Sequence, residues 1–120
     1  MHTLATVMIV LVAMLHLYFM ALEMFLWTKP AGRRAFGTTQ EFAEASKTLA
    51  ANQGLYNGFL AAGLLWSVWL GGGAGAAVAI FFLVCVVIAG VYGAITVNRK
   101  ILWVQAVPAF VALVLVHIPH

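Results

Sequence analysis

The sequence has 120 residues, of which 65% are hydrophobic and 8% charged, and its formal net charge at pH 7 is +3. A soluble domain carries about a quarter charged residues, so this composition excludes an ordinary water-soluble fold. The few cations adjoin apolar runs, which favours membrane lipids with anionic headgroups, and not nucleic acid, as the partner. The single cysteine, Cys85, excludes an internal disulfide framework.

Four apolar runs follow one another along the chain. A helix that crosses a bilayer needs about 20 apolar residues, and the four runs cover residues 3–27, 46–70, 74–97 and 101–118. No basic segment precedes the first run, which is also too long for the apolar core of a signal peptide, so we expect a retained helix. The sequence therefore predicts an all-α integral membrane four-helix bundle, with residues 1–120 forming a single domain.

The segments that connect these runs set the orientation. Proline and glycine end the first run, and the stretch from Thr38 to Glu41 matches a capping box that begins a polar helical segment reaching Ser46. The second connection is an uncharged glycine turn, residues 71–73. All six cations lie near the first and third connections, at Lys29, Arg33, Arg34, Lys47, Arg99 and Lys100. The positive-inside rule places these connections in the cytoplasm and both termini outside.

Polar side chains inside the runs gather at one depth. Such side chains are costly in a membrane and face protein or a water-filled cavity. Glu23 lies near the cytoplasmic end of the first run, and His16 lies deeper in the same run. The residues expected to bind a ligand lie in the cytoplasmic parts of the other runs: Asn52, Gln53, Tyr56, Asn57, Tyr92, Arg99 and Gln105. Together they predict a polar pocket open to the cytoplasmic leaflet.

Small residues predict where helices approach closely. At about 100° per residue, the four polar side chains of the second run fall within an arc of roughly 140°. Gly54 and Gly58 form a Gly-x-x-x-Gly motif on what we take to be a separate face, and Gly90 and Ala94 repeat the device in the third run. Such faces let membrane helices pack closely. Either could join copies of the chain in a homo-oligomer.

The polar residues leave several roles open. Glu23 could act as a general acid or base, or could pair with Arg99 or Lys100. The Asn/Gln/Tyr cluster could bind a ligand or only form hydrogen bonds between helices. His16 is either a hydrogen-bonded interior histidine, a second catalytic candidate, or an axial ligand of haem. We predict no metal site, and haem through His16 is the one cofactor considered.

Four stretches resemble a known family. They are HLYFMALEMFLW at residues 16–27, NQGLYNGFLA at 52–61, AGVYGA at 89–94 and VQAVPA at 104–109. They resemble the small bacterial membrane family known as domain of unknown function 1304, and the resemblance covers nearly the whole chain. It implies four helices in the cell inner membrane, as a multi-pass protein, and implies no particular activity.

Three functions are compatible with these patterns. The first is a site at which a small, mostly apolar or lipid-like molecule is bound or converted, with Glu23 at its centre. The polar start of the second run is similar to that of four-helix membrane enzymes that act on lipids and apolar epoxides. The second is a small proton-coupled exporter, a class that also has four helices and one glutamate in the first. The third is a structural or partner-binding membrane protein.

Overall fold

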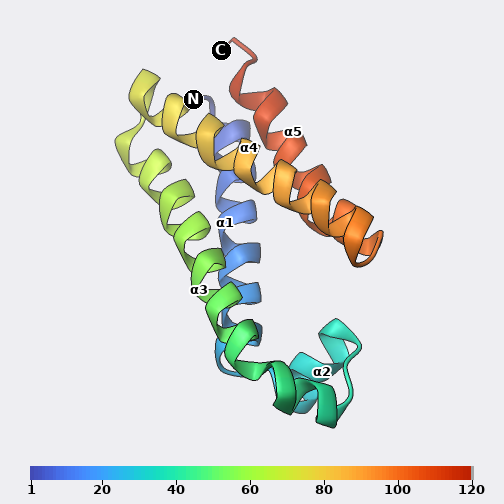
Figure 1. The fold of residues 1–120 in the computed structure, drawn as a ribbon. Coiled ribbons are helices and arrows are strands. Elements are labelled where there is room, and N and C mark those ends of the chain that lie inside the picture. The colour runs from blue at the N-terminus through green and yellow to red at the C-terminus, as the bar shows by residue number, and fades with distance from the viewer. Residues whose placement is uncertain (120) are drawn as a thin grey trace. The chain divides into compact units, whose positions relative to one another are not determined.

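The computed structural model describes residues 1–119. In chain order its elements are α1 (Thr3–Met24), α2 (Pro30–Phe36), α3 (Gln40–Leu70), α4 (Gly72–Thr96), the π-helix η1 (Leu102–Ala106) and α5 (Val107–Val116) (Figure 1). Residues 1–119 contain no strand, which confirms the all-α prediction.

Two of the helices have the length and apolar composition needed to cross a membrane. These are α1 and α4, whereas the apolar segment Leu102–Val116 is shorter. The 31-residue helix α3 is not among them, because charged residues occupy its first turns and amides and tyrosine its middle. Length and composition alone are also met by buried core helices and by N-terminal signal sequences, so the four crossings belong to the proposals below.

The chain divides into two compact units. Unit 1 comprises Met1–Ala13 together with the chain from Ala62 onward, and unit 2 comprises Met14–Ala61. Both α1 and α3 therefore contribute to each unit.

Unit 1 is organised around the contact of α4 with η1 and α5. A Cβ atom on Gly90 would lie 2.7 Å from the backbone nitrogen of Ala106, so only glycine allows this approach. The predicted fourth run is divided here, because the amide of Val107 bonds to the carbonyl of Leu102, five residues back. This wide turn directly precedes Pro108, whose ring has no N–H and clashes with the preceding turn of a regular α-helix.

Unit 2 is built from the second half of α1, the short helix α2 and the first part of α3. The helix α2 begins at Pro30, where the missing N–H costs nothing, and ends at Gly37 in the left-handed conformation, with φ of 65°. A Cβ on Gly32 would lie 2.1 Å from the carbonyl oxygen of Leu26, so glycine lets α2 fold back onto the end of α1.

The predicted capping box is wrong by one residue. The hydroxyl of Thr39 accepts a hydrogen bond from the amide of Phe42, at 3.1 Å, and so caps α3. The hydroxyl oxygen of Thr38 is buried and has no hydrogen-bond partner. From Gln40, α3 runs without a break to Leu70, so the polar segment and the second apolar run form one helix.

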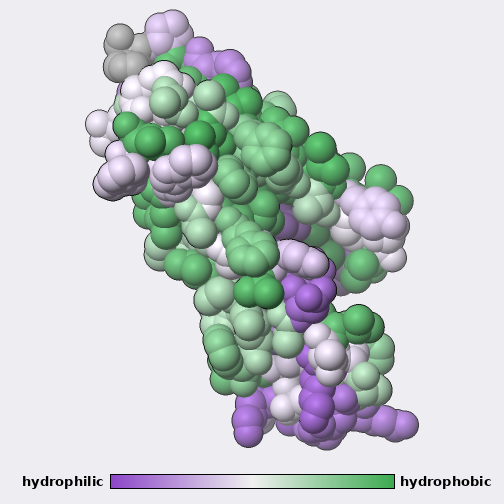
Figure 2. Space-filling model, turned by 60° about the vertical axis from the view of Figure 1, so that its left-hand side comes forward, coloured by the Kyte–Doolittle hydropathy of each residue, from purple (hydrophilic) through white to green (hydrophobic). Residues whose placement is uncertain are grey.

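The surface of unit 2 is divided along its length. Hydrophilic residues gather at the end formed by α2 and the first turns of α3, and mostly hydrophobic residues cover the remainder of the visible face (Figure 2). This division is the one expected for a helical pair that leaves an apolar layer and ends in water.

Candidate functional site

A buried polar pair links α1 and α3 inside unit 2. The side-chain amide Nδ2 of Asn57 donates a hydrogen bond to Oε1 of Glu23, at 2.5 Å. Glu23 is 8% exposed and Asn57 is 7% exposed. Glu23 is the last residue but one of α1. The pair is therefore a carboxyl held by an amide, at the end of an apolar helix.

Glycine on α3 makes this contact possible. A Cβ on Gly54 would lie 2.7 Å from Cγ of Met24 and 3.0 Å from Cβ of Glu23, and one on Gly58 would lie 2.8 Å from the sulfur of Met20. The absence of these Cβ atoms lets α3 approach α1 closely enough for the short Asn57 side chain to reach the carboxyl.

The predicted separation of α3 into a packing face and a polar face is wrong. In helical phase Gly54 lies between Asn57 and Gly58, about 60° from the first and about 40° from the second at 100° per residue, and all three face α1. The close-packing face and the buried polar contact are therefore the same face. The Gly-x-x-x-Gly motif is occupied by α1 of the same chain, and a homo-oligomer, through this face or through that of Gly90 and Ala94, stays a prediction.

The second carboxyl oxygen of Glu23 is open. No residue of unit 2 donates a hydrogen bond to Oε2. The four cations of the first connection make no ion pair with Glu23, and Lys47 pairs instead with Glu44, at 3.5 Å. Pairing of Glu23 with Arg99 or Lys100, which lie exposed on unit 1, stays a prediction.

The other polar residues of α3 do not join this pair. Asn52, Gln53 and Tyr56 are exposed, and the Tyr56 ring contacts that of Phe59 with centroids 6.0 Å apart. The predicted arc of four inward-facing side chains is thus wrong for three of them, since the side of α3 opposite Gly54 carries Asn52 and Tyr56. Their role as ligand-binding residues stays a prediction.

The candidate residues of unit 1 lie in different settings. Tyr92 is 69% exposed and its carbonyl accepts a bond from the hydroxyl of Thr96, at 2.7 Å. Arg99 is exposed, and Gln105 lies half-buried within η1 and takes part in an interaction there. A π-turn is frequent at functional sites, which keeps Gln105 a candidate.

His16 is fully buried on α1. Its ring meets that of Phe19 edge-on, with centroids 5.5 Å apart. Within residues 1–119, no group of three or more histidine, cysteine, aspartate or glutamate side chains could hold a metal ion. His16 is thus an interior histidine that also takes part in a further interaction, and its roles as a catalytic group or as a haem ligand stay predictions.

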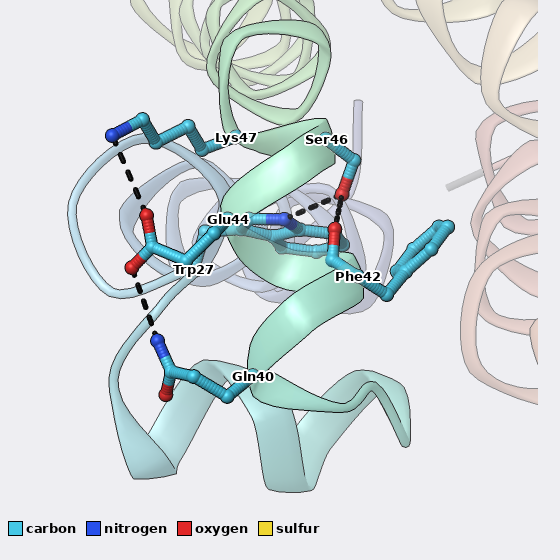
Figure 3. A network of polar contacts seen from close by, with 6 residues as sticks. All are labelled: Trp27, Gln40, Phe42, Glu44, Ser46 and Lys47. Carbon is cyan, nitrogen blue, oxygen red and sulfur yellow. Dashed lines mark hydrogen bonds and ion pairs between the residues drawn. The ribbon is translucent and has the colours of Figure 1, made fainter.

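Sequence reasoning missed a polar network at the end of unit 2. The indole nitrogen of Trp27 donates to the hydroxyl of Ser46, at 3.1 Å, and that hydroxyl donates to the carbonyl of Phe42, at 2.7 Å. Glu44 accepts from Gln40 and pairs with Lys47 (Figure 3). Nothing in the spacing between Trp27 and Ser46 indicates such a bond.

A surface hollow lies in unit 1. It is lined by the apolar residues Trp66, Ala77, Val78, Phe81 and Phe82 of unit 1. Its lining carries no titratable side chain, so it does not match the polar pocket that the sequence predicts.

Comparison with known proteins assigns the family. A family model described as "Protein of unknown function (DUF1304)" matches residues 10–117. The chain is also 32% identical over 116 residues to the "Uncharacterized protein YpaA" of Lactococcus lactis subsp. lactis (strain IL1403), a match that covers 95% of this chain and 97% of that protein. No solved structure is significantly similar. The chain therefore belongs to the DUF1304 family of proteins of unknown function.

Proposed function

We propose that the chain is a multi-pass protein of the inner membrane, a single domain of four crossings with both termini outside. Exposed apolar side chains support this. On α1 they recur three or four residues apart, at Leu4, Val7, Leu11, Met14 and Tyr18. On α4 they do the same, at Phe81, Val84, Ile88, Val91 and Ile95. Helical stripes of this kind are costly in water and match a face turned to lipid.

Within this frame, the Glu23–Asn57 pair is the centre of a binding site for a small apolar or lipid-like molecule that carries a hydrogen-bond donor. The observation that carries the proposal is the unequal use of the carboxyl oxygens: Asn57 occupies Oε1, and Oε2 is left open. A buried carboxyl is stable only when its oxygens have partners. An ammonium or hydroxyl group on an apolar ligand supplies that partner, and the methionines Met20 and Met24 beside it adapt to an apolar body.

If the ligand is converted, Glu23 is the group that takes or gives the proton. Asn57 fixes the carboxyl in one orientation, so that Oε2 faces the ligand and exchanges a proton with its donor group. In this account the candidate orienting groups within unit 2 are His16 and the amide of Gln53, which lies one turn from Asn57 on α3. Their contribution is testable one side chain at a time.

A second candidate function is structural. The close glycine contact beside Glu23 is also compatible with a structural role, in which the Glu23–Asn57 hydrogen bond only holds α1 against α3. A bond of this kind in a membrane stabilises by about 0.6–2 kcal/mol. The two functions differ at Oε2, which binds the ligand in the first and has no ligand in the second.

Carbodiimide labelling separates these two functions. The chain has only three acidic side chains, Glu23, Glu41 and Glu44, and the last two are exposed. We expect the hydrophobic dicyclohexylcarbodiimide to modify Glu23 in membranes, and a water-soluble carbodiimide to modify the two exposed carboxyls. Dodecanol should protect Glu23 alone. Modification that dodecanol does not slow would contradict a ligand site and favour the structural role.

The matched variants make the labelling specific. Glu23→Gln should lose the hydrophobic adduct and keep the modification of both exposed residues. Glu41→Gln should keep the adduct on Glu23 and its protection by dodecanol. An adduct that persists in Glu23→Gln would show that the modified group is not Glu23.

A further inference from the structure

The basic end of unit 2 is a second candidate for binding. We call residues 25–47 the basic hairpin: the segment that follows α1, the helix α2 and the first two turns of α3. It contains four of the six cations of the chain. The Glu23–Asn57 site does not use these cations, so it does not explain why this surface is basic.

The basic hairpin is held in one conformation by its own contacts. Trp27 lies at its centre, with its ring 5.0 Å from that of Phe36 on α2 and its indole nitrogen bonded to Ser46 on α3. Gly32 brings α2 against the backbone at Leu26. A surface fixed in this way loses little conformational entropy when it binds.

Three cations of the basic hairpin carry no neutralising partner. Glu44 is engaged by Lys47 and Gln40. Among the described residues, no carboxylate forms an ion pair with Lys29, Arg33 or Arg34. The only bond that their side chains make is from Nε of Arg33 to the carbonyl of Thr28, at 3.3 Å, which orients that guanidinium group without cancelling its charge.

Large apolar side chains are exposed among these cations. Phe25 is 67% exposed, Leu26 is 37%, Phe36 is 41% and Phe42 is 56%. A nucleic acid or an acidic protein would satisfy the cations and leave these side chains in water. The boundary between headgroups and acyl chains of an anionic bilayer satisfies both kinds of side chain at once.

We propose that the basic hairpin binds the phosphate groups of anionic phospholipids in the cytoplasmic leaflet through Lys29, Arg33 and Arg34, with Phe25, Phe36 and Phe42 inserted beside the acyl chains. This proposal rests on the membrane orientation proposed above. It is independent of any ligand at Glu23, since it uses neither carboxyl oxygen.

Quenching of Trp27 by brominated lipids tests the proposal directly. The full chain carrying Trp66→Phe, Trp69→Phe and Trp103→Phe keeps Trp27 as its one tryptophan, and the three replaced residues are all exposed. It is reconstituted in vesicles containing brominated phosphatidylglycerol or brominated phosphatidylcholine. We expect phosphatidylglycerol to be preferred at the Trp27 site by at least about fivefold, the effect of one cation near an anionic surface.

Charge variants show which residues cause the preference. In the same background, Lys29→Gln, Arg33→Gln and Arg34→Gln together should bring the preference close to one, whereas Arg99→Gln with Lys100→Gln should leave it unchanged. High salt should also weaken it. Equal quenching by both lipids before any cation is removed would overturn the proposal, as would a preference that survives the triple substitution.

Two further measurements keep the result interpretable. Circular dichroism shows whether the triple variant folds. If it does not, the single substitution Arg34→Gln, at an exposed side chain without a bond, should lower the preference by itself, and an undiminished preference would overturn the proposal. Labelling of the first connection from the cytoplasmic side, described in the Discussion, tests the orientation separately, so a wrong orientation is distinguishable from a wrong lipid assignment.

Discussion

Asn57 on α3 donates its side-chain amide to the carboxyl of Glu23 on α1, across a sequence separation of 34 residues. This one bond lies on the face where glycines bring the two helices together. The only buried carboxyl among the described residues therefore forms its hydrogen bond on the face through which α1 and α3 pack.

A double-mutant cycle measures the strength of the pair. Glu23→Leu and Asn57→Leu should each destabilise the protein, and the coupling free energy between them should be about 0.6–2 kcal/mol. The measurement is the free energy of unfolding in mixed micelles for the four proteins of the cycle. Coupling near zero would mean that the amide and the carboxyl do not interact in the folded chain.

Gly54→Ala should destabilise unit 2 by about 1–3 kcal/mol, the usual effect of overpacking. Its added Cβ would lie 3.0 Å from Cβ of Glu23 and 3.2 Å from the carbonyl oxygen of Met20, neither of which can move freely. Gly58→Ala is the matched control, because its Cβ would meet the far end of the flexible Met20 side chain. Equal losses in unfolding free energy would contradict the contact described at Gly54.

Gly90→Ala should likewise destabilise unit 1 by about 1–3 kcal/mol. The new Cβ would meet the backbone nitrogen of Ala106 at 2.7 Å, so the π-helix itself would have to shift. Gly93→Ala meets only the side chain of Ile101, at 3.1 Å, and should be tolerated better. The same unfolding measurement compares the two, and a greater loss at Gly93 would refute the account of this contact.

Single-cysteine labelling tests the proposed orientation. In a Cys85→Ala background, cysteines replacing the exposed residues Thr39, Asn98 and Gly73 are treated with a membrane-impermeant maleimide. We expect the cysteines at Thr39 and Asn98 to react only from the cytoplasmic side and the one at Gly73 only from outside, because cations flank the first and third connections. Reaction of Thr39→Cys and Gly73→Cys from the same side would exclude the four-crossing topology.

Much of the fold could be predicted because composition and small residues constrain it strongly. Apolar runs fixed the helical class, and Gly54, Gly58 and Gly90 do lie at close helix contacts. The prominence of Glu23 also followed from the rarity of carboxyls in apolar runs. These inferences need only local pattern and the cost of burying polar groups.

The remaining features depend on distances that no local pattern carries. Asn57 faces α1 because it lies on the same face of α3 as the glycines. Helical phase is compatible with this placement, but the sequence analysis grouped Asn57 with Asn52 and Tyr56, which are exposed. The bond from Trp27 to Ser46 depends on how α2 folds back at Gly32. The π-turn before Pro108 depends on a hydrogen bond shifted by one residue. Each of these features depends on the tertiary structure or on local backbone geometry, and the residue types alone are compatible with several alternatives.

The measurement that bears most directly on the proposed function is native mass spectrometry of the full chain, purified in mild detergent from its membrane, with Glu23→Gln and Glu41→Gln beside it. We predict a retained small molecule, apolar and bearing an amine or hydroxyl group, on the unaltered chain and on Glu41→Gln, and at least a tenfold lower occupancy on Glu23→Gln, about 1.4 kcal/mol of lost binding free energy. Equal occupancy in all three proteins, or none in any, would contradict a ligand site at Glu23.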